Sequence, residues 1–204
     1  MSREAPSHSA ESPDPQPRLD YVIVVAVEKG RSTPAPPVRV KPWTDTDLGL
    51  LRQANSPQMT RHLGGPESEL QILDRHRRYL NLDGTENGQM FTIRLLPEGE
   101  SVGIVGYWDR EWNGVEVYEV GWAVLPSFQG RGLAVAGTAA VIDRARAEGK
   151  FPFIHAFPSI DHPASNGVCR SLGFALVGEC EFEYPPGNHK PSNEWRLDLR
   201  ANQE

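Results

Sequence analysis

The segment from Val124 to Ala134, VLPSFQGRGLA, constrains the fold of this chain more than any other. An apolar run ends at Pro126, two glycines follow around an arginine, and helix-forming residues begin at once. Gly130 and Gly132 lack a Cβ atom, so they can adopt left-handed dihedrals and let a ligand approach the main chain. The free N–H groups and the positive dipole end of the next helix suit a phosphate. The segment therefore predicts a strand, a glycine loop and a helix that hold a nucleotide-like ligand.

The composition fits one soluble domain with polar extensions. The 204 residues can bury a sizeable core, and much of the excess among the 18 prolines lies near the start. We expect residues 1–20 to form a disordered tail, 21–37 an extra strand and linker, and 38–200 the domain. The tail lacks the basic and apolar regions of a signal peptide, and no apolar run approaches the roughly 20 residues of a membrane span. The expectation is a cytoplasmic protein without membrane contact.

Charge and cysteine content narrow the partners. The net charge of −6 argues against a nucleic-acid surface and weakly favours a cationic partner. Cys169 and Cys180 do not have the spacing of metal ligands, so we expect free thiols and no metal site. Cys169 is expected to be a small buried apolar residue.

The dipeptide Asn113-Gly114 lies between β-rich flanks and predicts a two-residue hairpin turn, which fixes the register. The predicted pairs are Trp112–Val115, Arg110–Val117, Trp108–Glu119 and Gly106–Gly121. Because side chains alternate along a strand, Glu119 and Trp108 share one face of the sheet. Trp122 and Val124 point to the opposite face.

The remaining elements follow from hydrophobic periodicity and from capping residues. Strands are predicted at 21–27, 38–42, 89–95, 102–112, 115–124, 153–157, 174–184 and 194–199. Helices are predicted after the cap Thr44 and at 66–82, 130–148 and 162–172, with 55–65 as a loop. Asp161 is expected to cap the last helix. The strand at 21–27 is either an edge strand of the same chain or an arm of a homodimer.

This order of elements, with QGRGLA after a strand and SLGF closing a later helix, resembles the GNAT superfamily of acyl-CoA-dependent N-acetyltransferases. The preceding EVGWAVLP is similar to the branch with the ribosomal-protein N-terminal acetyltransferases. The resemblance covers about Val38 to Leu199, and Gln129, Gly132 and Ala134 match the loop pattern Gln/Arg-x-x-Gly-x-Gly/Ala. It implies an α/β (α+β) fold with a mixed, mostly antiparallel sheet of about seven strands flanked by helices.

The resemblance implies direct transfer of an acetyl group from acetyl-CoA to a primary amine of a small molecule or peptide N-terminus, with CoA as product. The glycine loop would hold the diphosphate, and a backbone amide near Val124 would donate to the thioester oxygen. The predicted cofactor-binding residues are Trp122, Val124, Leu125, Gln129, Gly130, Arg131, Gly132, Leu133, Ala134, His162 and Ser165. His162 stands where the family often has an asparagine, and it either binds the cofactor or starts a helix. Cys169 stands where many members have a tyrosine that acts as the acid for the leaving thiolate. In this chain that role is vacant or is filled by another group.

Glu119 is the candidate general base. An amine is almost fully protonated at neutral pH, and a carboxylate beside an indole is partly desolvated, which raises its pKa towards the useful range. The alternative is a solvated strand face or an ion pair with Arg110, its diagonal neighbour. Ser165 is the second catalytic candidate, as a donor to the leaving thiolate, although it could equally bond the cofactor or its own helix.

The residues expected to contact the amine acceptor are Arg61 and His62 from the loop and Trp108 and Trp112 from the hairpin. Aromatic rings with nearby carboxylates suit a cationic amine, although the four residues could equally be solvated loop residues and core tryptophans. A non-catalytic acyl-CoA-binding module is the rival function. A P-loop hydrolase is disfavoured, because no Gly-Lys-Ser/Thr follows the glycines.

Overall fold

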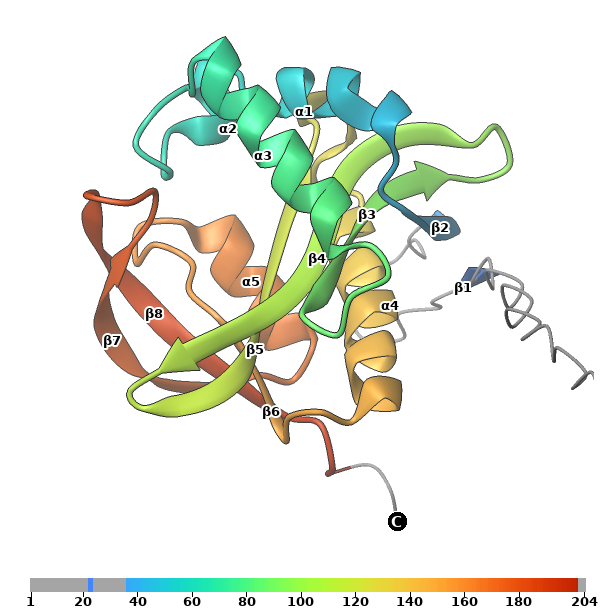
Figure 1. Ribbon diagram of the computed structural model, residues 1–204. Coiled ribbons are helices and arrows are strands. Elements are labelled where there is room, and N and C mark those ends of the chain that lie inside the picture. The colour runs from blue at the N-terminus through green and yellow to red at the C-terminus, as the bar shows by residue number, and fades with distance from the viewer. Residues whose placement is uncertain (1–21, 24–35, 202–204) are drawn as a thin grey trace, which may run out of the picture.

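The computed structural model describes residues 22–23 and 36–201, and its centre is a twisted sheet with helices on both faces (Figure 1). The strands are β1 Val22–Ile23, β2 Val38–Pro42, β3 Gly88–Leu95, β4 Glu100–Trp112, β5 Val115–Val124, β6 Phe153–Ala156, β7 Ala175–Glu183 and β8 His189–Asp198. The helices are α1 Leu48–Ala54, α2 Pro57–Thr60, α3 Glu69–Leu82, α4 Leu133–Glu148 and α5 Pro163–Ser171. The predicted tail at 1–20 and most of the segment 21–37 lie outside the described residues.

The strand order is β1-β2-β3-β4-β5-β6-β8-β7, and neighbours run antiparallel except for the parallel pair β5 and β6. This confirms the mixed, mostly antiparallel sheet predicted from the sequence. The described part of the first segment, β1, pairs with β2 of the same chain, as Val22 lies opposite Arg39 and Ile23 opposite Val38.

The hairpin between β4 and β5 has the predicted register. All four expected pairs occur, including Trp108 opposite Glu119 and Gly106 opposite Gly121. Asn113 and Gly114 both have positive φ angles, of 51° and 77°, which a tight turn between right-twisted strands requires. The two-residue turn thus places Glu119 as the sequence predicted.

The predicted helix starts need correction. The expected loop at 55–65 contains the one-turn helix α2. The third helix begins after Ser68, not at Pro66, because Ser68 and Gln71 form a capping box that satisfies both backbone N–H groups. The fourth helix begins at Leu133, since Gly132 is its N-cap. His162, not Asp161, caps α5, because the His162 ring accepts a hydrogen bond from the backbone N–H of Ser165.

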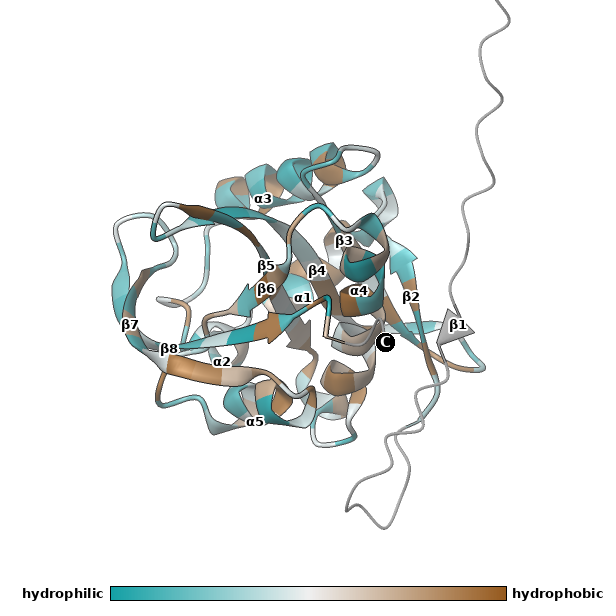
Figure 2. Ribbon diagram, turned by 90° about the horizontal axis from the view of Figure 1, so that it is seen from below, coloured by the Kyte–Doolittle hydropathy of each residue, from teal (hydrophilic) through white to brown (hydrophobic). Residues whose placement is uncertain are grey.

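Two hydrophobic layers hold the sheet. One lies against α4 and includes Tyr118, Val141 and Ile154; the other lies against α1 and α3 and includes Trp43 and Leu51. Figure 2 shows α3 striped with hydrophilic and hydrophobic residues, as expected for a helix that covers a sheet. Among the described residues no helix is long and apolar enough to cross a bilayer.

Asn166 on α5 connects three elements from a buried position. Its side-chain amide donates to the backbone oxygens of Ser159 and His162, each at 2.9 Å. Its oxygen accepts from the Asn193 amide and from the Trp195 indole N–H, each at 2.8 Å. All four hydrogen-bonding positions of the amide are therefore used, which fixes α5 against β8 and against the segment after β6.

Replacing Asn166 by Ala should lower the free energy of unfolding by about 3 kcal/mol, because the buried indole N–H and a buried carbonyl lose their partners. Urea denaturation measures this loss, and Ser171→Ala is a suitable control because it removes an exposed hydrogen bond on the same helix. A loss for Asn166→Ala no larger than that of the control would contradict this role.

Candidate functional site

The site lies where the only parallel strand pair of the described sheet separates. Strands β5 and β6 pair at Tyr118–Ile154 and Glu119–His155 and at no later position. A cleft of about 840 Å³ begins there, lined by residues 120–124 of β5 on one side and by residues 156–159 on the other. Ending the ladder inside the protein leaves backbone groups of β5 without a strand partner.

The backbone of Val124 points into this opening. The N–H of Leu125 donates to the oxygen of Val102 at 2.9 Å, so Val124 and Gly103 form a non-hydrogen-bonded pair. The N–H and C=O groups of Val124 therefore point away from β4, and alternation gives those of Trp122 the same direction. The Gln129 side chain donates to the oxygen of Val124 at 2.9 Å. No described residue accepts a hydrogen bond from the Val124 N–H.

The glycine loop and the start of α4 form the other end of the cleft. Gly130 and Gly132 have φ angles of 76° and 82°, and a Cβ atom built on Gly130 would meet no atom within 4 Å. The first backbone N–H groups of α4, in residues 133–135, have no acceptor within the helix. No other described backbone group accepts a hydrogen bond from them. These residues line the cleft, so an open main chain with a helix dipole faces it, which fits a diphosphate.

Most of the predicted cofactor-binding residues line this cleft, namely Trp122, Val124, Gln129, Gly130, Gly132, Leu133, Ala134, His162 and Ser165. Two do not. Leu125 is buried in the hydrophobic layer under α1 and α3. The Arg131 side chain is exposed, and its guanidinium lies 5.7 Å from the centre of the Phe128 ring.

Among the predicted acceptor residues, Arg61, His62 and Trp108 line the cleft and Trp112 does not. The Trp112 ring packs on Phe157 at a centroid distance of 4.6 Å. The Trp108 indole crosses β5 at Gly121, where a Cβ atom would come within 2.9 Å of the ring. A glycine at this position therefore allows the indole to lie against the strand.

Glu119 lies in the cleft wall and is 8% exposed. Arg110 donates to its carboxylate at 3.0 Å, so the predicted diagonal ion pair exists. Burial raises the pKa of Glu119, and the attraction of Arg110 together with a hydrogen bond from Trp108 opposes this only in part. The net result is a carboxylate with a raised pKa beside an indole, which are the properties expected of a general base near neutral pH.

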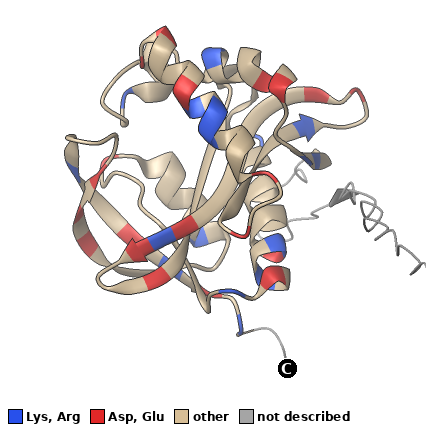
Figure 3. Ribbon diagram, viewed as in Figure 1, with Lys and Arg blue, Asp and Glu red and all other residues tan. Residues whose placement is uncertain are grey.

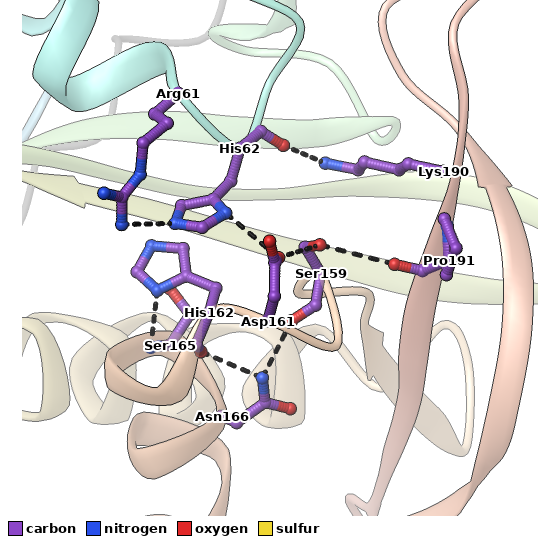
Figure 4. Close-up of polar contacts among 9 residues, drawn as sticks. All are labelled: Arg61, His62, Ser159, Asp161, His162, Ser165, Asn166, Lys190 and Pro191. Atoms are coloured by element: carbon purple, nitrogen blue, oxygen red, sulfur yellow. Dashed lines mark hydrogen bonds and ion pairs between the residues drawn. The ribbon is translucent and has the colours of Figure 1, made fainter.

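A polar cluster joins the two walls of the cleft near the start of α5 (Figure 4). His62 contacts the Asp161 carboxylate at 3.1 Å, and its ring lies over that of His162 with centroids 4.3 Å apart. Lys190 of β8 donates to the backbone oxygen of His62 at 2.7 Å. Burial, and next the neighbouring His62, lower the pKa of His162, which favours its neutral ring. Asp161 is drawn from the predicted capping position because Ser159 and His62 bond its carboxylate.

Several cleft residues have no counterpart among the sequence predictions. Arg75 and Tyr79 come from α3, while Phe182, Tyr184 and Lys190 come from the β7–β8 hairpin. No local pattern marks them, since they reach the cleft only through the folding of distant segments. No group of three or more His, Cys, Asp or Glu residues within the described part is arranged to hold a metal ion.

Residues 38–175 match a family model described as the acetyltransferase (GNAT) domain. The chain belongs to the GNAT acetyltransferase family. The match confirms the predicted family, an acyltransferase activity and acetyl-CoA as cofactor at the level of the family. A search of curated proteins found no match to this GNAT acetyltransferase.

Solved GNAT structures share the fold. One is RimJ from Mycobacterium smegmatis in complex with CoA-disulfide, with 17% identity, a TM-score of 0.68, and coverage of 83% of this chain and 85% of that one. An acetyltransferase from Salmonella typhimurium that modifies the N-terminal serine of a 50S ribosomal subunit protein has 18% identity, a TM-score of 0.65, and coverage of 79% and 94%. Spermidine N-acetyltransferase from Vibrio cholerae, in complex with CoA and spermine, has 13% identity, a TM-score of 0.64, and coverage of 79% and 95%.

Replacing Gly132 by Glu should weaken acetyl-CoA binding by about a hundredfold or more, because a carboxylate then lies at the helix start that receives the diphosphate. Isothermal titration measures the affinity. Gly149→Glu is the matched control, since Gly149 ends the same helix with a φ of 66° and has similar backbone strain. Equal affinities for the two variants would show that the loop does not bind the cofactor.

Proposed function

We propose that this enzyme transfers an acetyl group from acetyl-CoA to a primary amine of a small molecule or peptide N-terminus, directly in a ternary complex. Acetyl-CoA supplies the acetyl group as an activated thioester. The observation that carries the proposal is one cleft with an open strand edge at Trp122 and Val124 and an open helix start at 133–135. Both present unpaired backbone donors, and neither depends on the identity of a side chain.

Different backbone groups bind different parts of the cofactor. The amides of residues 132–135 bind the diphosphate, and the N–H and C=O groups of Trp122 bond the amide groups of the pantetheine arm as an added strand would. The Val124 N–H donates to the thioester oxygen, on which negative charge develops during attack. Loss of one such donor typically costs about a hundred- to a thousandfold in rate. Fixing the acetyl carbon beside the amine supplies the larger share of the acceleration.

Glu119 takes the proton that the attacking amine must lose, directly or through a water molecule. Its position opposite Trp108 and its raised pKa support this role. The ion pair with Arg110 occupies one carboxylate oxygen, Oε2, and holds the side chain in place.

Ser165 is the hydroxyl that we assign to the leaving thiolate. It lines the cleft, whereas Cys169 is fully buried and has a pKa raised by burial to about 12. A thiol in that position cannot reach the departing sulfur. A thiolate also accepts a proton from water, so the contribution of Ser165 is expected to be small.

Replacing Glu119 by Gln should lower kcat/KM at neutral pH by about a hundredfold, because the amine then loses its proton acceptor. In the unaltered enzyme the rate should fall as the pH drops through the pKa of Glu119, which lies above the usual 4.5. This acid limb should disappear in the variant, and activity should recover at high pH. Release of CoA thiol across a pH series measures both effects.

Glu116→Gln is the matched control, because Glu116 lies on the same strand and is exposed. Similar pH profiles for the enzyme and for Glu119→Gln would assign Glu119 a structural role. Saturable CoA binding without thiol release for every amine tested would instead indicate a non-catalytic acyl-CoA-binding module.

A further inference from the structure

The charged residues that line the cleft have a positive balance, whereas the whole sequence has a negative net charge. The sequence has a net charge of −6, and Figure 3 shows both basic and acidic residues on α3 and at the end of β4. Among the described residues that line the cleft, Arg61, Arg75 and Lys190 are basic and Glu119 alone is acidic.

Internal ion pairs account for two of these four charges. Arg110, outside the cleft lining, neutralises Glu119. Glu67 forms an ion pair with Arg75 on α3. Arg61 is exposed, and its guanidinium contacts the ring of His62 at 3.1 Å. The remaining cation is Lys190, which is partly buried.

The Lys190 ammonium has hydrogen-bond donors in the cleft that its backbone acceptor does not use. An ammonium has three N–H groups, and one of them donates to the backbone oxygen of His62 at 2.7 Å. No described carboxylate oxygen lies within 4.0 Å of the Lys190 ammonium nitrogen, the distance that defines an ion pair. Burial lowers the pKa of Lys190, against the weaker attraction of Asp161 and Glu119. Its ammonium lies 5.9 Å from the centre of the Tyr184 ring. The residue is therefore a partly buried cation whose two remaining donors lack an anionic partner.

Lys190 and Glu119 face the same space. Lys190 lies opposite Phe182 in the β7–β8 hairpin, both residues line the cleft, and the charge of Lys190 acts on Glu119. An acceptor bound there meets a carboxylate base and an ammonium together. A molecule with an amine and an anion satisfies both groups, whereas a polyamine places a second positive charge near Lys190.

We propose that the acceptor carries an anionic group, a carboxylate or a phosphate, next to its amine, and that Lys190 binds this group while the amine lies beside Glu119. The inference rests on the proposed function. It makes Lys190 a specificity-determining residue, since charge-assisted hydrogen bonds to an anion are roughly twice as strong as neutral ones.

Two matched acceptor pairs test the proposal: alanine with alaninamide, and phosphoethanolamine with ethanolamine. Within each pair, the anionic member is the one that carries a carboxylate or phosphate beside its amine. The ratio of kcat/KM for this member over the member without such a group is measured by CoA thiol release. At least one anionic member should be favoured by about tenfold or more. Alaninamide is the weaker base, so a preference for alanine cannot arise from easier loss of the amine proton. The pair with the higher ratio distinguishes a carboxylate from a phosphate.

Three variants separate recognition of the anion from support of the loop. Lys190→Gln should bring the ratio to about one, and Lys190→Arg should retain most of it. Lys41→Gln, at an exposed position of β2, should leave it unchanged. A purely structural Lys190 would lower kcat/KM for both members of a pair equally. Ratios of one or less in the unaltered enzyme, or an unchanged ratio in Lys190→Gln, would overturn the proposal.

A binding measurement keeps the two proposals distinguishable. The same amines are added to the protein saturated with CoA, and their effect on the thermal midpoint is recorded. Stabilisation by the anionic members alone, abolished by Lys190→Gln, without any turnover would support the anion site and contradict the transferase function. Equal stabilisation by both members of each pair would contradict the anion site.

Discussion

The early end of the ladder between β5 and β6 is the constraint from which the site follows. A parallel pair that stops after Glu119–His155 leaves the inner edge of β5 with backbone groups that the protein does not satisfy. Satisfying them would require another strand or a ligand shaped like one. The start of α4 has the same deficit, since its first N–H groups face the same cleft. One extended ligand with amide groups and a diphosphate meets both needs, which is why an acyl-CoA suits this architecture.

The hairpin and the glycine loop could be predicted because their causes are local. Asn113-Gly114 admits one register, and that register places Glu119 opposite Trp108. The helix starts were less predictable, because capping partners compete: Ser68 with Gln71 displaced the start expected at Pro66, and His162 took the capping role expected of Asp161. In the first case the boundary lies two positions further along the chain, and in the second the cap is the neighbouring residue.

The distant contacts of the site had no signature in the sequence. His62 meets Asp161 across 99 positions, and Lys190 reaches the backbone of His62 across 128. Such contacts arise where α5 and the β7–β8 hairpin lie against the loop. Asn166 holds α5 against β8 and against the segment after β6 through four hydrogen bonds. The net charge of −6 describes the whole chain and not the cleft, whose lining carries Arg61, Arg75 and Lys190 against Glu119.

The most direct test of this account is amide hydrogen exchange, residue by residue, with and without CoA. The backbone N–H groups of Val124 and of residues 133–135 should exchange quickly in the free protein and become protected when CoA binds, while the paired core of β4 changes little. Slow exchange of these groups in the absence of CoA would mean that the protein already satisfies them. No change at saturating CoA would likewise contradict a cofactor held by the main chain.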